Sequence, residues 1–180
     1  MLKNWKIIAP LAAVLSCPSL GHTQALPTAT GNGALLVGGG WSYVRPDYGQ
    51  KAIQGITAYG DFNFLPHVGA EAEYHYIGVI TPTDLGENSF LVGPRYFIPH
   101  GRFNFYAKAV FGFAKFDIQE IQDNPGAGTG TYFAYAAGGG VDYRFKPKFA
   151  VRGDFEYQHW NYLTGLTPAV ITVGFVYRLR

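Results

Sequence analysis

The 180-residue chain has almost no cysteine, few charged residues and no long apolar run beyond its N-terminal segment. Cys17 is the only cysteine, so the chain can form no internal disulfide and no metal site built from several cysteines. Charged residues make up 14% of the chain, and no later segment reaches the roughly 18 consecutive apolar residues of a membrane-spanning helix. These scarcities exclude a disulfide-stabilised domain, a cysteine-ligated metal centre and a helical membrane protein.

The first 25 residues have the pattern of a secretory signal peptide. Lys3 and Lys6 precede an apolar run over 7–15, and the small residues of 23–25 suit a cleavage site. The apolar run is too short to cross a bilayer as a helix. We therefore expect residues 1–25 to be removed after export.

Residues 26–180 are then expected to form one mature domain. Loss of the two N-terminal lysines leaves twelve basic against twelve acidic residues, so no charge excess points to nucleic acid. The cysteine is lost as well, unless the chain is cleaved as a lipoprotein and Cys17 is lipidated, which stays open.

The full chain is rich in aromatic residues (17%) and glycine (24 residues), and its mature part is arranged in segments that alternate between apolar and polar. Short and long connections alternate between these segments, with short turns at 65–67, 99–102 and 146–148. Segment lengths suit membrane-crossing strands, which need about 9–11 tilted residues. The pattern predicts an all-β fold, an eight-stranded antiparallel up-and-down transmembrane β-barrel with both termini at the short-turn end. The expected strands are 34–43, 52–64, 68–78, 89–98, 103–116, 131–145, 149–160 and 169–179.

The two faces of these strands differ in size and charge. One face carries most of the Phe and Tyr side chains, which would overfill the narrow lumen of an eight-stranded barrel. The other carries charged residues interleaved with glycines, which leave room for long side chains. We therefore predict that the aromatic face points into lipid and that the charged face fills the interior. The predicted interior charge network consists of Asp61, Glu71, Glu73, His75, Arg95, Lys108, Asp142, Arg144, Arg152, Asp154, Glu156 and Arg178.

Five basic residues nearly balance six carboxylates in this set, as a narrow interior requires, because unpaired buried charge is costly. The network includes Arg152-Gly153-Asp154, a tripeptide that adhesion receptors recognise in other proteins. Alternation places Arg152 and Asp154 inward, so we expect no display of this signal. Further basic residues (Arg102, Lys146, Lys148 and Arg180) gather at the short-turn rim.

Catalytic, cofactor and metal sites are not expected. His159 is the best candidate for a catalytic histidine of a lipid A-modifying enzyme, but neither Ser42 nor Ser89 is linked to it by any motif. His75 stands beside Glu73 and is interpreted as a member of the hydrogen-bonded network. Trp41 and Trp160 fall near the long-loop ends of their strands and are interpreted as anchors at the membrane interface.

The last strand matches the C-terminal assembly signal of bacterial outer-membrane barrels at Thr172, Gly174, Tyr177 and Leu179, although the chain ends on Arg180 instead of an aromatic residue. Together with the segments GAEAEYHYIG, LVGPRYFIP and GGGVDYRFKPKFAVRGDFEYQHW, the chain resembles the OmpA/OmpX-type family of eight-stranded barrels. The resemblance implies a monomeric protein of the bacterial cell outer membrane with a structural or surface-interaction role. Its partners would be outer-membrane lipid and, during biogenesis, the outer-membrane assembly machinery.

Two alternatives remain open from the sequence. One is a soluble periplasmic barrel of lipocalin type, in which the aromatic residues would line a ligand cavity. The other is a membrane-embedded enzyme that modifies lipid A.

Overall fold

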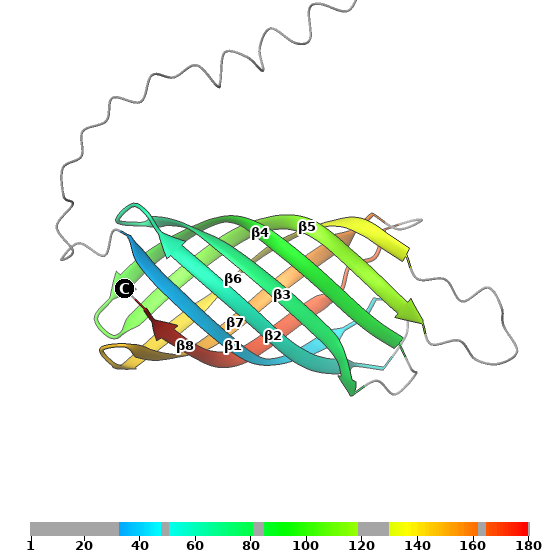
Figure 1. Cartoon of the computed structure of the whole chain (residues 1–180), viewed down its shortest axis with the longest axis horizontal. Coiled ribbons are helices and arrows are strands. Elements are labelled where there is room, and N and C mark those ends of the chain that lie inside the picture. The colour runs from blue at the N-terminus through cyan, green and yellow to red at the C-terminus, as the bar shows by residue number, and fades with distance from the viewer. Residues whose placement is uncertain (1–32, 48–50, 81–84, 119–129, 162–164, 180) are drawn as a thin grey trace, which may run out of the picture.

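The computed structural model describes residues 33–47, 51–80, 85–118, 130–161 and 165–179. They form a closed barrel of eight antiparallel strands, in which each strand pairs with its neighbours in sequence and β1 closes on β8 (Figure 1). The predicted fold class is therefore confirmed. The strands are β1 (Ala34–Arg45), β2 (Ile53–Asn63), β3 (Val68–Ile80), β4 (Leu85–His100), β5 (Phe103–Ile118), β6 (Gly130–Lys146), β7 (Phe149–Trp160) and β8 (Ala169–Arg178).

The expected signal peptide and Cys17 lie outside the described residues, as does Arg180. Within the described ranges, no helix is long and apolar enough to cross a membrane. Both ends of the barrel-forming chain lie at the same end of the barrel, because Ala34 pairs with Asn63 and Leu36 pairs with Arg178. This is the end that carries the short turns, as predicted.

The outer surface of the barrel is apolar and aromatic. Alternation along each strand turns one series of side chains outward, and on β8 Val173 and Phe175 are 60% and 64% exposed. Aromatic pairs such as Phe103–Tyr143 and Phe149–Tyr177, with ring centroids 5.1 and 4.9 Å apart, lie on this surface near the short turns. The outward assignment of the aromatic face is confirmed.

Pro94 lies inside β4, where a residue without an N–H would be expected to force a bulge or a change of phase. The structure shows neither. Pairing of β4 with β5 stops at Val92 and resumes at Arg95 in the same register, and Pro94 faces Ala70 on β3. The strand therefore keeps its alternation across the proline, and Arg95 still points inward.

The inward face is mostly apolar in the half of the barrel nearest the long loops, where Glu87 of β4 is the buried acidic residue opposite Ile77. Val44, Ile53, Ile77 and Val170 form one buried cluster there. A second buried cluster includes Trp160, which is 2% exposed and therefore is not the interface anchor expected from the sequence. These clusters close the interior at the long-loop end. The charged residues fill the interior between these clusters and the short-turn end. The second cluster consists of Leu91, Val110, Ala114, Ala134, Ala136 and Trp160, with Tyr132 and Leu166 against it.

Candidate functional site

Ten of the twelve residues predicted for the interior charge network lie together inside the barrel. They come from β2 through β7, and none is more than 7% exposed. We call this set the interior cluster. It consists of Asp61, Glu71, Glu73, His75, Arg95, Lys108, Asp142, Arg152, Asp154 and Glu156.

Two arginines and two aspartates form the half of the cluster nearer the short turns. Arg95 donates to Asp61, and its Nη2 lies 2.9 Å from Asp142 Oδ2. Arg152 donates through Nε to Asp142 Oδ1 at 2.7 Å and through Nη2 to Asp61 Oδ2 at 2.5 Å. Each carboxylate thus bridges both guanidinium groups, a charge-assisted geometry that fixes all four side chains.

Tyrosine rings lie against both guanidinium groups. The Arg95 guanidinium carbon is 3.7 Å from the centroid of Tyr106, and that of Arg152 is 4.3 Å from the centroid of Tyr59. Such cation–π contacts add to the ion pairs where water is excluded. Glycine makes room for the rings, since a Cβ at Gly140 would lie 2.7 Å from the Tyr106 hydroxyl oxygen.

Lys108 is the centre of the other half of the cluster. Its Nζ lies 3.1 Å from Glu71 and 2.5 Å from Glu73. It also lies 3.1 Å from both Asp154 and Glu156. Four carboxylates therefore surround one ammonium group, which has only three N–H donors. Around Lys108 the negative charges outnumber the positive one.

His75 joins this half of the cluster from β3. Its Nδ1 lies 2.7 Å from Thr57 Oγ1, and its Nε2 lies 3.1 Å from Glu156 Oε1. Glu73, His75 and Glu156 also bring one ligand atom each within 4.8 Å of one another, a spacing that could hold a metal ion. The Lys108 ammonium group already lies against both glutamates, so we interpret the three residues as members of the ion-pair network.

Arg144 and Arg178 do not belong to the interior cluster, contrary to the sequence-based expectation. The Arg144 side chain is exposed, and its Nη2 donates to the carbonyl oxygen of Gly101 at 2.8 Å. Arg178 is partly exposed at the end of β8. Both positions have inward parity, but they lie at the strand ends, beyond the cluster. The cluster therefore holds six carboxylates against three permanent cations and His75.

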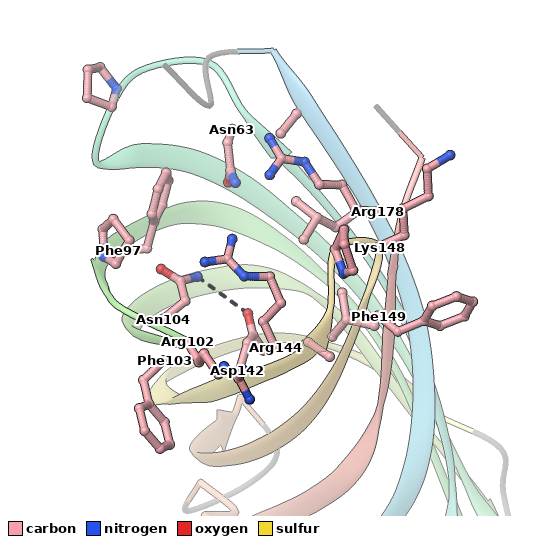
Figure 2. Close-up of a pocket in the computed structure, with 17 residues that line it drawn as sticks. Asn63, Phe97, Arg102, Phe103, Asn104, Asp142, Arg144, Lys148, Phe149 and Arg178 are labelled. Carbon is pink, nitrogen blue, oxygen red and sulfur yellow. Dashed lines mark hydrogen bonds between the residues drawn. The ribbon is translucent and has the colours of Figure 1, made fainter. Parts of the chain in front are cut away.

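The barrel opens at the short-turn end into a cavity of about 500 Å³, which we call the mouth (Figure 2). Arg144 and Arg178 line it, together with Arg102 and Lys148 from the turns after β4 and β6. Asp142 lies at its inner side, where Asn104 Nδ2 is 3.5 Å from Asp142 Oδ2 (Figure 2). The sequence signalled only a basic rim here, because it does not show that the turns surround a cavity.

The structure does not bring the candidate catalytic histidine, His159, together with a serine among the described residues. Ser42 is fully buried, contacts Thr57 and lies 2.7 Å from Thr172 through the two hydroxyl oxygens. His159 packs its ring on Tyr135 at 4.9 Å, and no hydrogen bond joins it to a serine within the described ranges. The histidine and the serines therefore make no catalytic pair.

The adhesion tripeptide and the C-terminal pattern both follow the alternation. Arg152 and Asp154 are 1% and 7% exposed, so a receptor has no access to the tripeptide in the barrel. On β8, Thr172 is buried in the interior while Leu179 is 50% exposed on the outside. The remaining positions of the pattern are Gly174, which is buried, and Tyr177, which is partly buried.

The chain belongs to the outer membrane protein beta-barrel domain family, whose profile matches residues 9–178. Among solved structures it is similar to OprG of Pseudomonas aeruginosa, with a TM-score of 0.62 and 16% identity over 83% of this chain and 97% of that one. It is also similar to Ail, the attachment invasion locus protein of Yersinia pestis, with a TM-score of 0.53 and 20% identity over 82% of this chain and 99% of that one.

A de novo designed transmembrane β-barrel matches comparably, with a TM-score of 0.55 and 16% identity over 82% of this chain and 97% of that one. A search of the curated proteins finds no match. Because a designed barrel fits about as well as natural ones, the similarity shows the fold alone, and function has to be argued from the residues.

Proposed function

We propose that the protein is a small structural barrel of the bacterial outer membrane whose lumen is plugged by the interior cluster. The observation that carries this proposal is the combination of an apolar outer surface with the ten buried side chains of the interior cluster. At the centre of the cluster, the gap beside Lys108 and Glu73 is too small for a water molecule. A barrel filled in this way supplies a rigid body in the membrane and not a passage.

The proposal also covers export, assembly and orientation of the barrel. Residues 1–25 direct export, the assembly machinery recognises the C-terminal pattern ending at Leu179, and the monomeric barrel holds its long loops at the cell surface for contacts. The short-turn end, with the mouth, then faces the periplasm. No nucleic acid or cofactor is needed for any of these roles.

Two observations favour this proposal over the alternatives. In a lipocalin-type carrier the aromatic residues would line the ligand cavity, whereas here most Phe and Tyr side chains are exposed on the outer surface. The middle of the lumen is filled by the interior cluster and by the apolar side chains around Trp160. A lipid A-modifying enzyme needs a histidine beside its nucleophile, and His159 packs instead on Tyr135.

Cell fractionation combined with gel mobility tests the proposal. The protein should be found in the outer-membrane fraction, and its detergent-solubilised form should migrate differently before and after boiling, because a closed barrel resists unfolding in detergent. Recovery of the protein in the soluble periplasmic fraction, with one mobility in both states, would reject the membrane barrel and favour the carrier.

A further inference from the structure

We propose that the mouth is a binding site for a small phosphate ester. The inference goes beyond the structural role proposed above and relies on it only for the compartment that the mouth faces. It starts from the convergence of basic side chains from separate parts of the chain on one cavity. Arg102, Arg144, Lys148 and Arg178 all line the space of about 500 Å³, and Figure 2 shows them around it.

Two of the basic side chains of the mouth, Arg102 and Arg144, have no acidic partner among the described residues. Asp142 is the only acidic residue among its lining residues, and Arg95 and Arg152 already bind it at 2.9 and 2.7 Å. Among the described residues, no carboxylate lies within ion-pair distance of Arg102 or Arg144. Arg102 and Arg144 thus lack the carboxylate partners that neutralise the arginines of the interior cluster.

The carboxylate excess of the interior cluster offers a different reason for basic residues at the mouth. Charges separated by a low-dielectric interior attract one another over several ångströms, so mouth cations could offset that excess without binding anything. Every carboxylate of the cluster, however, already has a cation of the cluster within 3.1 Å. The offset also leaves unexplained why the basic residues surround an open cavity and why neither Arg102 nor Arg144 forms an ion pair with a cluster carboxylate.

The geometry of Arg144 suits it to hold an anion. Its Nη2 donates to the carbonyl oxygen of Gly101, a turn residue whose φ of 60° lies in the left-handed region that glycine adopts readily. That bond occupies one of the five N–H donors of the guanidinium group. A planar fork with free donors matches phosphate oxygens in bidentate fashion, and Arg102 beside it supplies the second charge that a phosphate dianion requires.

The remaining lining residues indicate an ester and not a bare phosphate ion. The cavity volume lies within the range of small-molecule sites, about 300–1,000 Å³, and is far larger than one phosphate group. Phe97, Phe103 and Phe149 supply apolar walls. Asn63 and Asn104 add polar side chains to these walls.

Two sources can present this chemistry at the mouth. A soluble phosphate ester can enter from the aqueous side. Alternatively, a phospholipid headgroup can reach over the rim, because exposed aromatic pairs such as Phe103–Tyr143 surround this end, and aromatic belts lie at the level of lipid headgroups. Glycerol phosphate is common to both sources and serves as the probe.

The soluble source is tested by titrating the folded, detergent-solubilised protein with glycerol 3-phosphate in a calorimeter at fixed ionic strength. We expect saturable binding that weakens at least tenfold in the double variant Arg102→Gln/Arg144→Gln. The control variant Arg45→Gln/Lys115→Gln removes two exposed charges at the opposite end and should bind like the parent protein. Boiled and unboiled gel mobility verifies that both variants are folded.

The lipid source is tested in nanodiscs of phosphatidylcholine with or without phosphatidylglycerol. Native mass spectrometry then counts the phosphatidylglycerol that stays bound after release from the nanodisc. The mouth variant is again Arg102→Gln/Arg144→Gln. The site is assigned to lipid headgroups if the parent and control proteins retain phosphatidylglycerol, the mouth variant does not, and none of them binds glycerol 3-phosphate. Absence of both signals, or equal signals in mouth and control variants, overturns the inference. The fractionation result is independent of this outcome, so the two proposals fail separately.

Discussion

Lys108 holds four carboxylates with a single ammonium group, at distances between 2.5 and 3.1 Å. Replacing it with methionine keeps the length of the side chain but leaves these carboxylates facing one another. We expect Lys108→Met to lower the free energy of unfolding by about 3–5 kcal/mol, the usual cost of removing one partner from a buried ion pair. Urea titration of the refolded barrel, followed by tryptophan fluorescence, measures this change.

Lys115 provides the matched control on the same strand, because its side chain is exposed. Lys115→Met should change stability by no more than about 0.5 kcal/mol, as surface substitutions usually do. Equal effects of the two substitutions would mean that the Lys108 contacts contribute nothing specific.

The pairing of Arg152 with Asp142 can be measured by a double-mutant cycle. Arg152→Gln and Asp142→Asn each leave a charged partner behind, whereas the double variant removes both charges. We expect the double variant to be destabilised less than the sum of the single variants, with a coupling of about 1–3 kcal/mol in chemical denaturation. The cycle of Arg144→Gln with Asp142→Asn should be additive to within about 0.5 kcal/mol, because Arg144 bonds to a backbone carbonyl instead. Additivity in the first cycle would contradict the network.

At the scale of a strand, β8 shows a clear division into an inward face of buried residues and an outward face of exposed apolar residues. Phe175 is 64% exposed on the outer surface, so Phe175→Arg would place a charge in lipid. The expected cost is about 2–4 kcal/mol near the bilayer midplane. Folding titrations in phospholipid vesicles measure it, with Phe175→Leu as the control that keeps the position apolar. If Phe175→Arg leaves the folding free energy unchanged, this face of β8 does not contact lipid.

Two glycines on adjacent strands test whether the interior is packed. A Cβ at Gly140 on β6 would lie closest to the Gly153 carbonyl oxygen and 2.7 Å from the Tyr106 hydroxyl oxygen, whereas a Cβ at Gly153 on β7 would have no atom within 4 Å. We expect Gly140→Ala to cost about 1–3 kcal/mol by overpacking. Gly153→Ala should be neutral or slightly stabilising, since alanine loses less chain entropy than glycine. Thermal unfolding in detergent compares the two, and equal midpoints would argue against the close packing around Gly140.

For the molecule as a whole, the filled lumen predicts an electrically silent barrel. The apolar cluster around Trp160 closes one end, and below it the ion pairs of Lys108 and Arg152 leave no water-wide passage at their centre. Reconstituted into planar bilayers, the protein should therefore give no stable conductance steps. Regular steps in the parent protein would show that the interior cluster opens, and the plug would have to be abandoned.

Alternation along the strands determined the fold and most of the interior residues in advance. A period of two assigns each side chain to a face, so it placed Lys108 and Arg152 inward and Phe175 outward. The alternation of short and long connections determined the order of the strands and the end at which Ala34 and Arg178 lie. Even the proline in β4 left this pattern intact, because the register is the same on both sides of it.

Depth along the barrel and contacts across the lumen were decided only by the tertiary structure. Arg144 and Trp160 have the inward parity of Lys108, yet one lies at the mouth and the other in the apolar cluster near the long loops. The reason is that the parity of a strand is local, whereas depth depends on the stagger with which eight tilted strands close. The same closure brings Lys108 of β5 against Glu73 of β3 and Glu156 of β7, strands that do not pair with β5. It also gathers two turns and two strand ends around the mouth, which no pattern within any one of these segments predicts.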